Sequence, residues 1–228
     1  MPQDIAWENE YQNPQLITKE DRPQKDVLRF FKFLKKVGGI ALENLTVLDL
    51  GSGTGRNANY LAELGNKVIG LEISPTAIDL AESRAKEMRI EVEYLLHDIG
   101  SVYPFGNETF DLVLDVTSSN SLNSKEREIY LSEVFRVLKK GGYFFVKGLC
   151  KEGDKNAKAL IKINPGLEPD TYINEDMNLI ERVFTQQDFI NLYAKYFKII
   201  KLIKKTNYTR FRGQSYKRNF WLAYMKKI

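Results

Sequence analysis

A glycine-rich segment directly after an apolar run carries the strongest chemical signal in this chain. The run is Val47-Leu48-Asp49-Leu50, and the segment is Gly51-Ser52-Gly53-Thr54-Gly55. Glycines between a strand and a helix let a ligand approach the backbone closely, and the beginning of the helix offers unpaired N–H groups to an anionic group. The segment therefore predicts a ligand-binding turn; a tight turn without a ligand is the alternative.

An acidic residue stands at the distance from this turn that suits nucleoside binding. Glu72 lies 21 residues after Gly51, at the end of a second β-rich run. A carboxylate there can accept hydrogen bonds from both hydroxyls of a ribose. The glycines alternate, and Arg56 stands where the dinucleotide fingerprint G-x-G-x-x-G has its third glycine. The pattern thus argues against a nicotinamide-dependent oxidoreductase.

The elements that would position these residues alternate between strands and helices. Strands are expected at 46–50, 67–71, 91–96, 110–116, 143–147, 198–204 and 220–225, and helices at 21–37, 56–64, 74–89, 124–138 and 186–196. Ser74, Ser124 and Thr185 are the expected N-caps, and Gly141-Gly142 is expected to end the fourth helix. Strands that are apolar on nearly every position predict a parallel sheet with helices on both faces.

The chain is expected to form a single domain, 1–228, with four parts. Residues 1–40 are an irregular arm (1–20) followed by a helix, and 45–149 form the ligand-binding core. The polar segment 150–184 is expected to be a lid-like insertion. Residues 185–228 contribute the final helix and an antiparallel hairpin whose strands are joined by a basic loop.

The composition excludes several classes of protein. A net charge of +4 is mild, whereas a nucleic-acid binder with a dedicated basic stripe usually has a larger excess. One cysteine, Cys150, and one histidine, His97, leave no intrachain disulfide and no Cys/His cluster for zinc. No apolar run approaches the ~20 residues of a transmembrane helix, and the first residues lack signal-peptide regions. We expect a soluble, cytoplasmic protein without a metal site or a membrane partner.

The segment 47–55 resembles the first motif, V-L-D-x-G-x-G-x-G, of the class I S-adenosylmethionine-dependent methyltransferases. Later segments are similar to further landmarks of that family, in order: Leu71-Glu72-Ile73-Ser74, His97-Asp98-Ile99, Tyr103-Pro104-Phe105, Phe110-Asp111-Leu112-Val113-Leu114 and Arg136-Val137-Leu138-Lys139-Lys140-Gly141-Gly142. The resemblance covers about residues 45–149. It implies an α/β Rossmann-like fold with a seven-stranded, mostly parallel sheet and a C-terminal antiparallel hairpin, and S-adenosylmethionine as the cofactor.

The resemblance also implies roles for individual residues around the cofactor. Asp49 and the backbone of Gly51–Gly55 would hold the methionine end, Glu72 would hold the ribose, and Ile73 would pack on the adenine. An amino-acid zwitterion needs both donors and acceptors, which this set supplies.

The resemblance also implies which residues would contact the adenine edge and the methyl group of the cofactor. Asp98 would accept from the adenine amino group, and the Ile99 N–H would meet a ring nitrogen; without the resemblance, Asp98 could equally cap a turn. Asp115 and Val116 would border the methyl group. Asp115 could bind the cofactor's ammonium, act as a base, or cap a loop. His97 could act as a base, but a solvent-facing or stacked histidine is the favoured interpretation.

Substrate selection is expected in the segments outside the core. Trp7-Glu8-Asn9-Glu10-Tyr11 resembles the W-x-x-x-Y opening of some small-molecule methyltransferases, in which such an arm often folds over the cofactor. Trp7, Tyr11, Tyr172 and Phe184 are aromatic residues in polar, lid-like segments and are candidates for the acceptor pocket. Packing or surface aromatics are the alternative.

A basic stretch near the end leaves the class of acceptor open. Its cations are interleaved with Tyr208, Phe211 and Tyr216, and such a pattern can bind single-stranded nucleic acid or form a solvated hairpin. The cations are Lys198, Lys201, Lys204, Lys205, Arg210, Arg212, Lys217 and Arg218. The favoured function is methyl transfer to a small molecule. The alternatives are an RNA or protein methyltransferase and a non-catalytic cofactor-binding module.

In-line transfer from a sulfonium needs alignment more than acid–base catalysis, so no catalytic residue is named. Cys150 is expected to be buried or incidental. The oligomeric state is left open.

Overall fold

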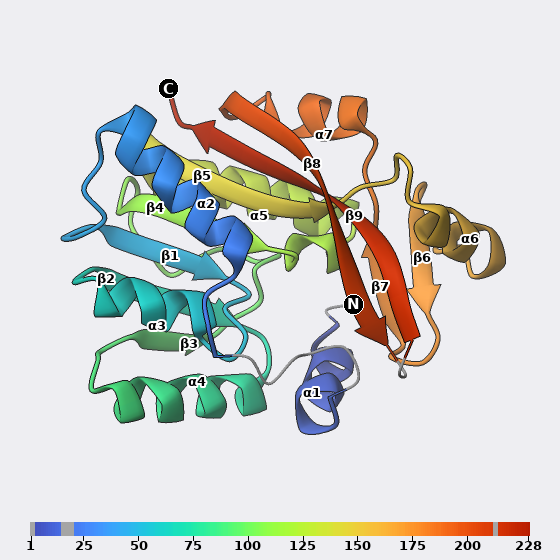
Figure 1. Ribbon diagram of the computed structural model, residues 1–228, viewed down its shortest axis with the longest axis horizontal. Coiled ribbons are helices and arrows are strands. Elements are labelled where there is room, and N and C mark those ends of the chain that lie inside the picture. The colour runs from blue at the N-terminus through green and yellow to red at the C-terminus, as the bar shows by residue number, and fades with distance from the viewer. Residues whose placement is uncertain (1–2, 15–20, 212–213) are drawn as a thin grey trace.

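The computed structural model describes residues 3–14, 21–211 and 214–228 and centres on a seven-stranded sheet (Figure 1). The strand order is β3-β2-β1-β4-β5-β9-β8, with β1 to β5 parallel and β9 antiparallel to both of its neighbours. The strands are β1 (Thr46–Leu50), β2 (Lys67–Glu72), β3 (Glu93–Leu96), β4 (Phe110–Val116), β5 (Leu138–Leu149), β8 (Lys198–Phe211) and β9 (Gln214–Lys226). The predicted fold class is confirmed.

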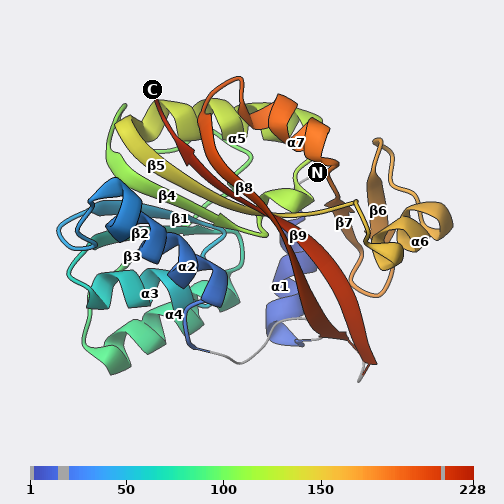
Figure 2. The same ribbon diagram turned by 45° about the horizontal axis from the view of Figure 1, so that its top comes forward.

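Helices cover both faces of the sheet because successive strand residues point to opposite sides (Figures 1 and 2). In β4, Val113 packs in the core with residues of α5 and α7, whereas Leu112 and Leu114 pack with residues of α2, α3 and α4. These helices are α2 (Lys25–Phe33), which continues into the π-helical turn η1 (Leu34–Gly38), α3 (Arg56–Glu63), α4 (Pro75–Met88), α5 (Ser124–Val137) and α7 (Gln186–Tyr193).

Two of the three predicted N-caps are confirmed. The hydroxyls of Ser74 and Thr185 each accept a hydrogen bond from the backbone N–H three residues later, at 3.1 Å. Helix α5 is capped by Asn123 rather than Ser124, because Asn123 and Glu126 form a reciprocal capping box. The prediction that Gly141-Gly142 ends this helix is wrong: α5 ends at Val137, and both glycines lie inside β5.

Part of the expected irregular arm is the helix α1 (Asp4–Gln12), whereas residues 15–20 lie outside the described residues. Its sequence has no clear apolar stripe, so tertiary contacts must stabilise it. Ala6 and Trp7 pack against Met177 and Leu179 in the segment after β5. The Gln3 side chain hydrogen-bonds both the N–H and the carbonyl of Ile180.

The polar segment after β5 folds into the helix α6 (Lys155–Ile163) and a hairpin of β6 (Thr171–Asn174) and β7 (Leu179–Arg182), which stand beside the main sheet (Figure 2). We call residues 150–184 the insertion. It has a small core in which Ala157 and Tyr172 pack against Leu149 of β5 and Phe220 of β9.

The prediction of a basic loop between the last two strands is wrong. Strands β8 and β9 remain paired from Lys198↔Lys226 to Phe211↔Gln214, so most of the basic stretch is strand; Arg212 lies outside the described residues. Threonine and aromatic residues in this stretch favour extended backbone despite the charges between them.

Candidate functional site

The turn after β1 has three glycines in the left-handed region of the backbone. Their φ angles are +63° at Gly51, +55° at Gly53 and +77° at Gly55. A Cβ on Gly53 would lie 2.7 Å from the hydroxyl oxygen of Tyr11, which reaches the turn from α1. Because Gly53 has no side chain, Tyr11 of α1 can approach the backbone of the turn closely.

The carboxylate of Glu72, at the end of β2, joins this turn to the beginning of α4. Oε2 accepts from the Gly53 N–H at 2.8 Å, and Oε1 accepts from the N–H groups of Ile73 and Ser74 at 2.8 and 3.0 Å. Burial raises the pKa of Glu72, and the three backbone hydrogen bonds oppose that rise. The structure thus brings Glu72 to the glycine turn.

Two polar atoms beside the turn are buried without a hydrogen-bond partner among the described residues: Asp49 Oδ2 and Ser52 Oγ. Burial, together with the carboxylates of Asp115 and Glu72, raises the pKa of Asp49 to about 7, although Arg56 opposes the rise. A buried carboxylate oxygen without a donor is costly, so this position suits a cationic or N–H-bearing ligand group.

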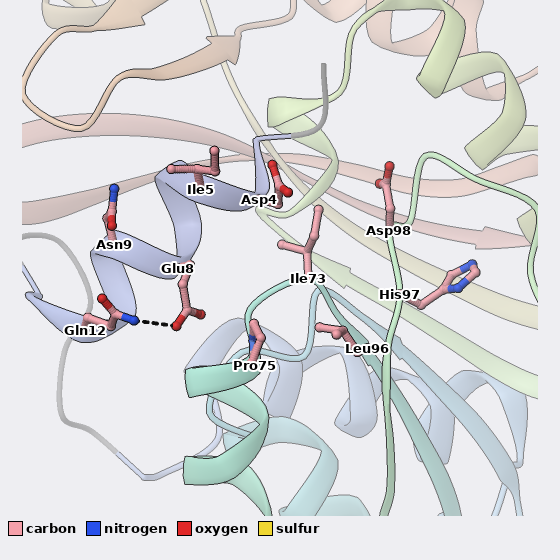
Figure 3. Close-up of a pocket in the computed structure, with 10 residues that line it drawn as sticks. All are labelled: Asp4, Ile5, Glu8, Asn9, Gln12, Ile73, Pro75, Leu96, His97 and Asp98. Atoms are coloured by element: carbon pink, nitrogen blue, oxygen red, sulfur yellow. Dashed lines mark hydrogen bonds between the residues drawn. The ribbon is translucent and has the colours of Figure 1, made fainter.

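A cavity of about 480 Å³ lies between α1 and the ends of β2 and β3 (Figure 3). Its walls carry both apolar and polar side chains, as the edge and faces of a heterocycle require. The lining residues are Asp4, Ile5, Glu8, Asn9 and Gln12 from α1, and Ile73, Pro75, Leu96, His97 and Asp98 from the opposite wall.

The residues predicted at the adenine edge lie at or next to this cavity. Asp98 lines it, and its Oδ1 also accepts from the Gly100 N–H at 2.8 Å, so it caps a turn as well. The Ile99 side chain is buried in the core. His97 Nε2 lies 3.0 Å from Ser101 Oγ, and its ring stands edge-on to Tyr103. This agrees with the stacked alternative for His97.

The carboxylate of Asp115 is fully buried and holds the loop after β4. Oδ1 lies 2.5 Å from Ser118 Oγ and accepts from the N–H groups of Ser118 and Ser119, while Oδ2 accepts from Tyr130 Oη at 2.6 Å. Of the three roles considered, this geometry favours the loop cap. Val116 is the last residue of β4.

The structure divides the four predicted acceptor-pocket aromatics. Tyr11 lies over the glycine turn, where burial and then the Glu72 carboxylate raise its pKa, and its ring centroid is 6.4 Å from that of Trp7. Both residues come from α1.

Tyr172 and Phe184 do not join that pair. Tyr172 is buried in the insertion core, where its hydroxyl donates to Glu181 and accepts from Arg218. Phe184 is buried in the main core, edge-on to Phe189. Packing, the alternative considered for them, describes both side chains.

The acid that docks α1, Glu8, is not among the site residues predicted from the sequence. Glu8 Oε2 accepts from Ser74 Oγ at 2.5 Å and from the Thr76 N–H at 3.2 Å, and Oε1 accepts from Thr76 Oγ1. Burial alone would raise the pKa of Glu8, but the hydrogen bonds from Ser74, Thr76 and Gln12 outweigh it and hold the pKa below the ordinary 4.5. An acidic side chain is favourable near the N-terminus of a helix such as α4. Glu8 could have been predicted on this basis only if the contact between α1 and α4 had been known.

The basic stretch has both internal and exposed members. Arg218 is committed to Asp154 at 3.3 Å and to Tyr172 at 2.8 Å. Lys201, Lys204 and Tyr208 are exposed along the edge strand β8. The exposed set fits either a solvated edge or a nucleic-acid contact.

Three further features bear on other kinds of site: metal-ligand groups, membrane-spanning helices and the cysteine thiol. Among the described residues, no group of three His, Cys, Asp or Glu side chains could hold a metal ion. No helix in the described ranges is long and apolar enough to cross a membrane. Cys150 is buried, and burial raises its pKa to about 12, so its thiolate is disfavoured.

The sequence of this chain is similar to those of known methyltransferases. A family model described as a methyltransferase domain matches residues 48–146. An uncharacterised methyltransferase of Schizosaccharomyces pombe is 31% identical over segments that cover 46% of this chain and 72% of that protein.

Two further relatives are named for different acceptors. An 18S rRNA (guanine-N(7))-methyltransferase of Bos taurus is 30% identical, over 47% of this chain and 43% of that protein. A 2-heptyl-1-hydroxyquinolin-4(1H)-one methyltransferase of Mycobacteroides abscessus is 31% identical, over 55% of this chain and 52% of that protein. The chain spans about half the length of several curated relatives that it matches.

A solved structure shares the fold over nearly its whole length. The S-adenosylmethionine-dependent methyltransferase of Methanosarcina mazei superposes with a TM-score of 0.73 at 20% identity, covering 91% of this chain and 99% of that chain.

The docking of α1 through Glu8 can be tested with Glu8→Gln. The variant loses charge-assisted hydrogen bonds worth about 1 kcal/mol at a partly exposed site, so amide hydrogen exchange of residues 3–14 at pH 7 should accelerate about fivefold. Because the folded-state pKa lies below the ordinary value, this contribution is present above about pH 4.5 and is lost as the pH falls further. The difference between wild type and variant should therefore vanish under acid conditions.

Glu63→Gln, an exposed acid on α3, is the control and should leave exchange in α1 unchanged. Equal exchange in wild type and Glu8→Gln at pH 7 would show that α1 does not depend on this carboxylate.

Proposed function

This chain belongs to the class I S-adenosylmethionine-dependent methyltransferases, and on that premise we propose that it transfers a methyl group from this cofactor to a small-molecule acceptor by in-line displacement. The observation that carries the proposal is the grouping of a left-handed glycine turn, the buried Glu72 carboxylate and the unpartnered Asp49 Oδ2 at one edge of the sheet.

The donor and acceptor atoms at the turn fit the methionine end of the cofactor. Asp49 Oδ2 would accept from the ammonium, whose positive charge would offset the burial and the neighbouring carboxylates that raise the pKa of Asp49. Ser52 Oγ, also without a partner among the described residues, can donate to a carboxylate. The N–H groups of Ser52, Gly53 and Gly55 donate inside the protein, so those of Gly51 and Thr54 are the further donors proposed at this end.

Ribose and adenine would occupy the space from Glu72 to the cavity against α1. Glu72 holds three backbone N–H groups, and the remaining lone pairs of its carboxylate can accept ribose hydroxyls. Ile73 and Asp98 line the cavity from the side opposite α1, which suits packing on adenine and acceptance from its amino group. The Ile99 N–H is proposed to meet a ring nitrogen.

When bound, S-adenosylmethionine supplies a methyl group on a sulfonium, which is already activated for displacement. The chain's task is then to align the acceptor and to exclude water. Trp7 and Tyr11 of α1 would cover the cofactor from above the turn. Asp115, held by its four hydrogen bonds, would keep the loop after β4 in place beside the methyl group rather than serve as a base.

A small molecule is favoured as the acceptor because α1, which packs against the insertion, forms one wall of the cavity at the ends of β2 and β3 where the cofactor would lie. RNA is the second candidate, since Lys201, Lys204 and Tyr208 are exposed on β8 and one relative is named for rRNA.

Glu72→Gln should weaken S-adenosylmethionine binding, because an amide cannot accept from two ribose hydroxyls while it retains the N–H groups of the turn. The expected loss is about 1.5–3 kcal/mol, or roughly 10- to 150-fold in Kd, measured by equilibrium titration. Glu91→Ala, an exposed acid before β3, is the control and should bind as the wild type does. An unchanged Kd in Glu72→Gln would refute the placement of the ribose.

The acceptor class can be read from transfer of labelled methyl groups into a cell extract divided into small-molecule, RNA and protein fractions. We expect label in the small-molecule fraction. Label in RNA, falling steeply with added salt, would favour the second candidate. Tight cofactor binding without transfer to any fraction would point to a binding module.

A further inference from the structure

Four buried side-chain atoms without a hydrogen-bond partner belong to residues of α5, of β7 and of the 3₁₀ turn η2 (Ser119–Ser121), which follows β4 and packs against β7. Only two further such atoms occur within the described ranges, and both lie beside the glycine turn. The four atoms are Asn120 Nδ2, Ser121 Oγ, Arg127 Nε and Arg182 Nε.

The two arginines both lie close to one aromatic ring. The guanidinium carbons of Arg127 and Arg182 are 5.0 and 5.1 Å from the centroid of Phe184. Arg127 is 1% exposed and donates to the carbonyls of Ser119 and Leu122 at 2.7 and 2.6 Å, which leaves its Nε–H unused. Burial and the charge of Arg182 both lower the pKa of Arg127, so an anion beside the two groups would be favourable.

The nearby acids are engaged with other donors. Asp115 accepts hydrogen bonds from Ser118, Ser119 and Tyr130. Glu168 accepts from the N–H and hydroxyl of Ser124 at 2.9 and 2.7 Å. Asp115 acts on Arg127, and Glu168 acts on both arginines, through space only. They balance charge but do not supply an acceptor atom to the unpartnered N–H groups.

The chemistry of the group is one-sided. Asn120 accepts from the Leu149 N–H through Oδ1, so its unpartnered Nδ2 is a donor, and both arginine Nε atoms are donors as well. Buried donors without partners are rare in native structures and call for an explanation. A ligand that satisfies them must present acceptor oxygens.

The position of the group relates it to the methyl acceptor. It lies just beyond β4, whose end borders the methyl group in the proposed function, and Gln3 before α1 donates to the Ser121 carbonyl at 2.6 Å. It is therefore on the side of the sheet edge away from the adenine cavity. We propose that Arg127 and Arg182, with Asn120 and Ser121, bind an anionic oxygen group of the acceptor, such as a carboxylate, and so select anionic small molecules as substrates; this rests on the proposed function.

The charge of the acceptor can be measured before the acceptor is identified. The small-molecule fraction of a cell extract is separated on an anion exchanger at pH 7, and each pool is incubated with the full chain and methyl-labelled S-adenosylmethionine. We expect label only with the pool that binds the exchanger. Label only with the unbound pool would overturn the proposal.

The residues are tested with the active pool. Arg182→Met should raise the acceptor KM about tenfold or more, as loss of a charged hydrogen bond implies, with kcat changed less and the Kd for S-adenosylmethionine unchanged. Arg182→Lys, which keeps the charge, should recover part of the loss. Arg89→Met, an exposed arginine after α4, is the matched control and should behave as the wild type.

An acceptor KM that is the same in wild type and Arg182→Met would also overturn the proposal. Failure of the proposed function gives a different result: no small-molecule pool accepts label from the wild type, whatever its charge.

Discussion

The buried carboxylate of Glu72 is the contact on which the rest of the site depends. It binds the backbone of the turn after β1 through Gly53 and the beginning of α4 through Ile73 and Ser74. Two successive strand-to-helix connections are thereby fixed relative to each other. Because these connections follow parallel strands, both lie at the same edge of the sheet. Helix α1 then docks on the same α4 terminus through Glu8, and this contact forms the wall of the cavity opposite Ile73.

Two kinds of incomplete hydrogen bonding distinguish the two ends of this edge. Near the glycine turn, a carboxylate oxygen of Asp49 lacks a donor, which suits a cationic group. Beyond β4, the Nε–H groups of Arg127 and Arg182 lack acceptors, which suits an anionic group. Asp115 lies between them with all of its hydrogen bonds made inside the protein. In the proposed function, the cofactor's ammonium and an anionic group of the acceptor would meet these two opposite requirements.

The core of this arrangement was predictable because its signals are local. Gly51, Gly53 and Gly55 do form a turn between a strand and a helix, as predicted, and Ser74 does cap its helix. Alternation of strands and helices was sufficient for the sheet and for the closing hairpin, which are confirmed.

The remaining features depend on contacts between distant segments. Helix α1 has a polar sequence and is held by residues of the insertion, so no local pattern reveals it. The polar residues around Tyr172 suggest a lid. In the structure, however, Tyr172 is buried against Phe220 of β9, some fifty residues later in the chain. Arg127 lies on a helix between the exposed residues Lys125 and Glu128, and only the packing of η2 and Phe184 buries it.

The central claim, that S-adenosylmethionine binds along this edge, is tested most directly by hydrogen exchange of the full chain with and without the cofactor. The account predicts slower exchange at the glycine turn 51–55, at 72–74, at 97–100 and in α1, with little change in β8 and β9. Binding that leaves these segments unchanged, or protection confined to other parts of the chain, would contradict it.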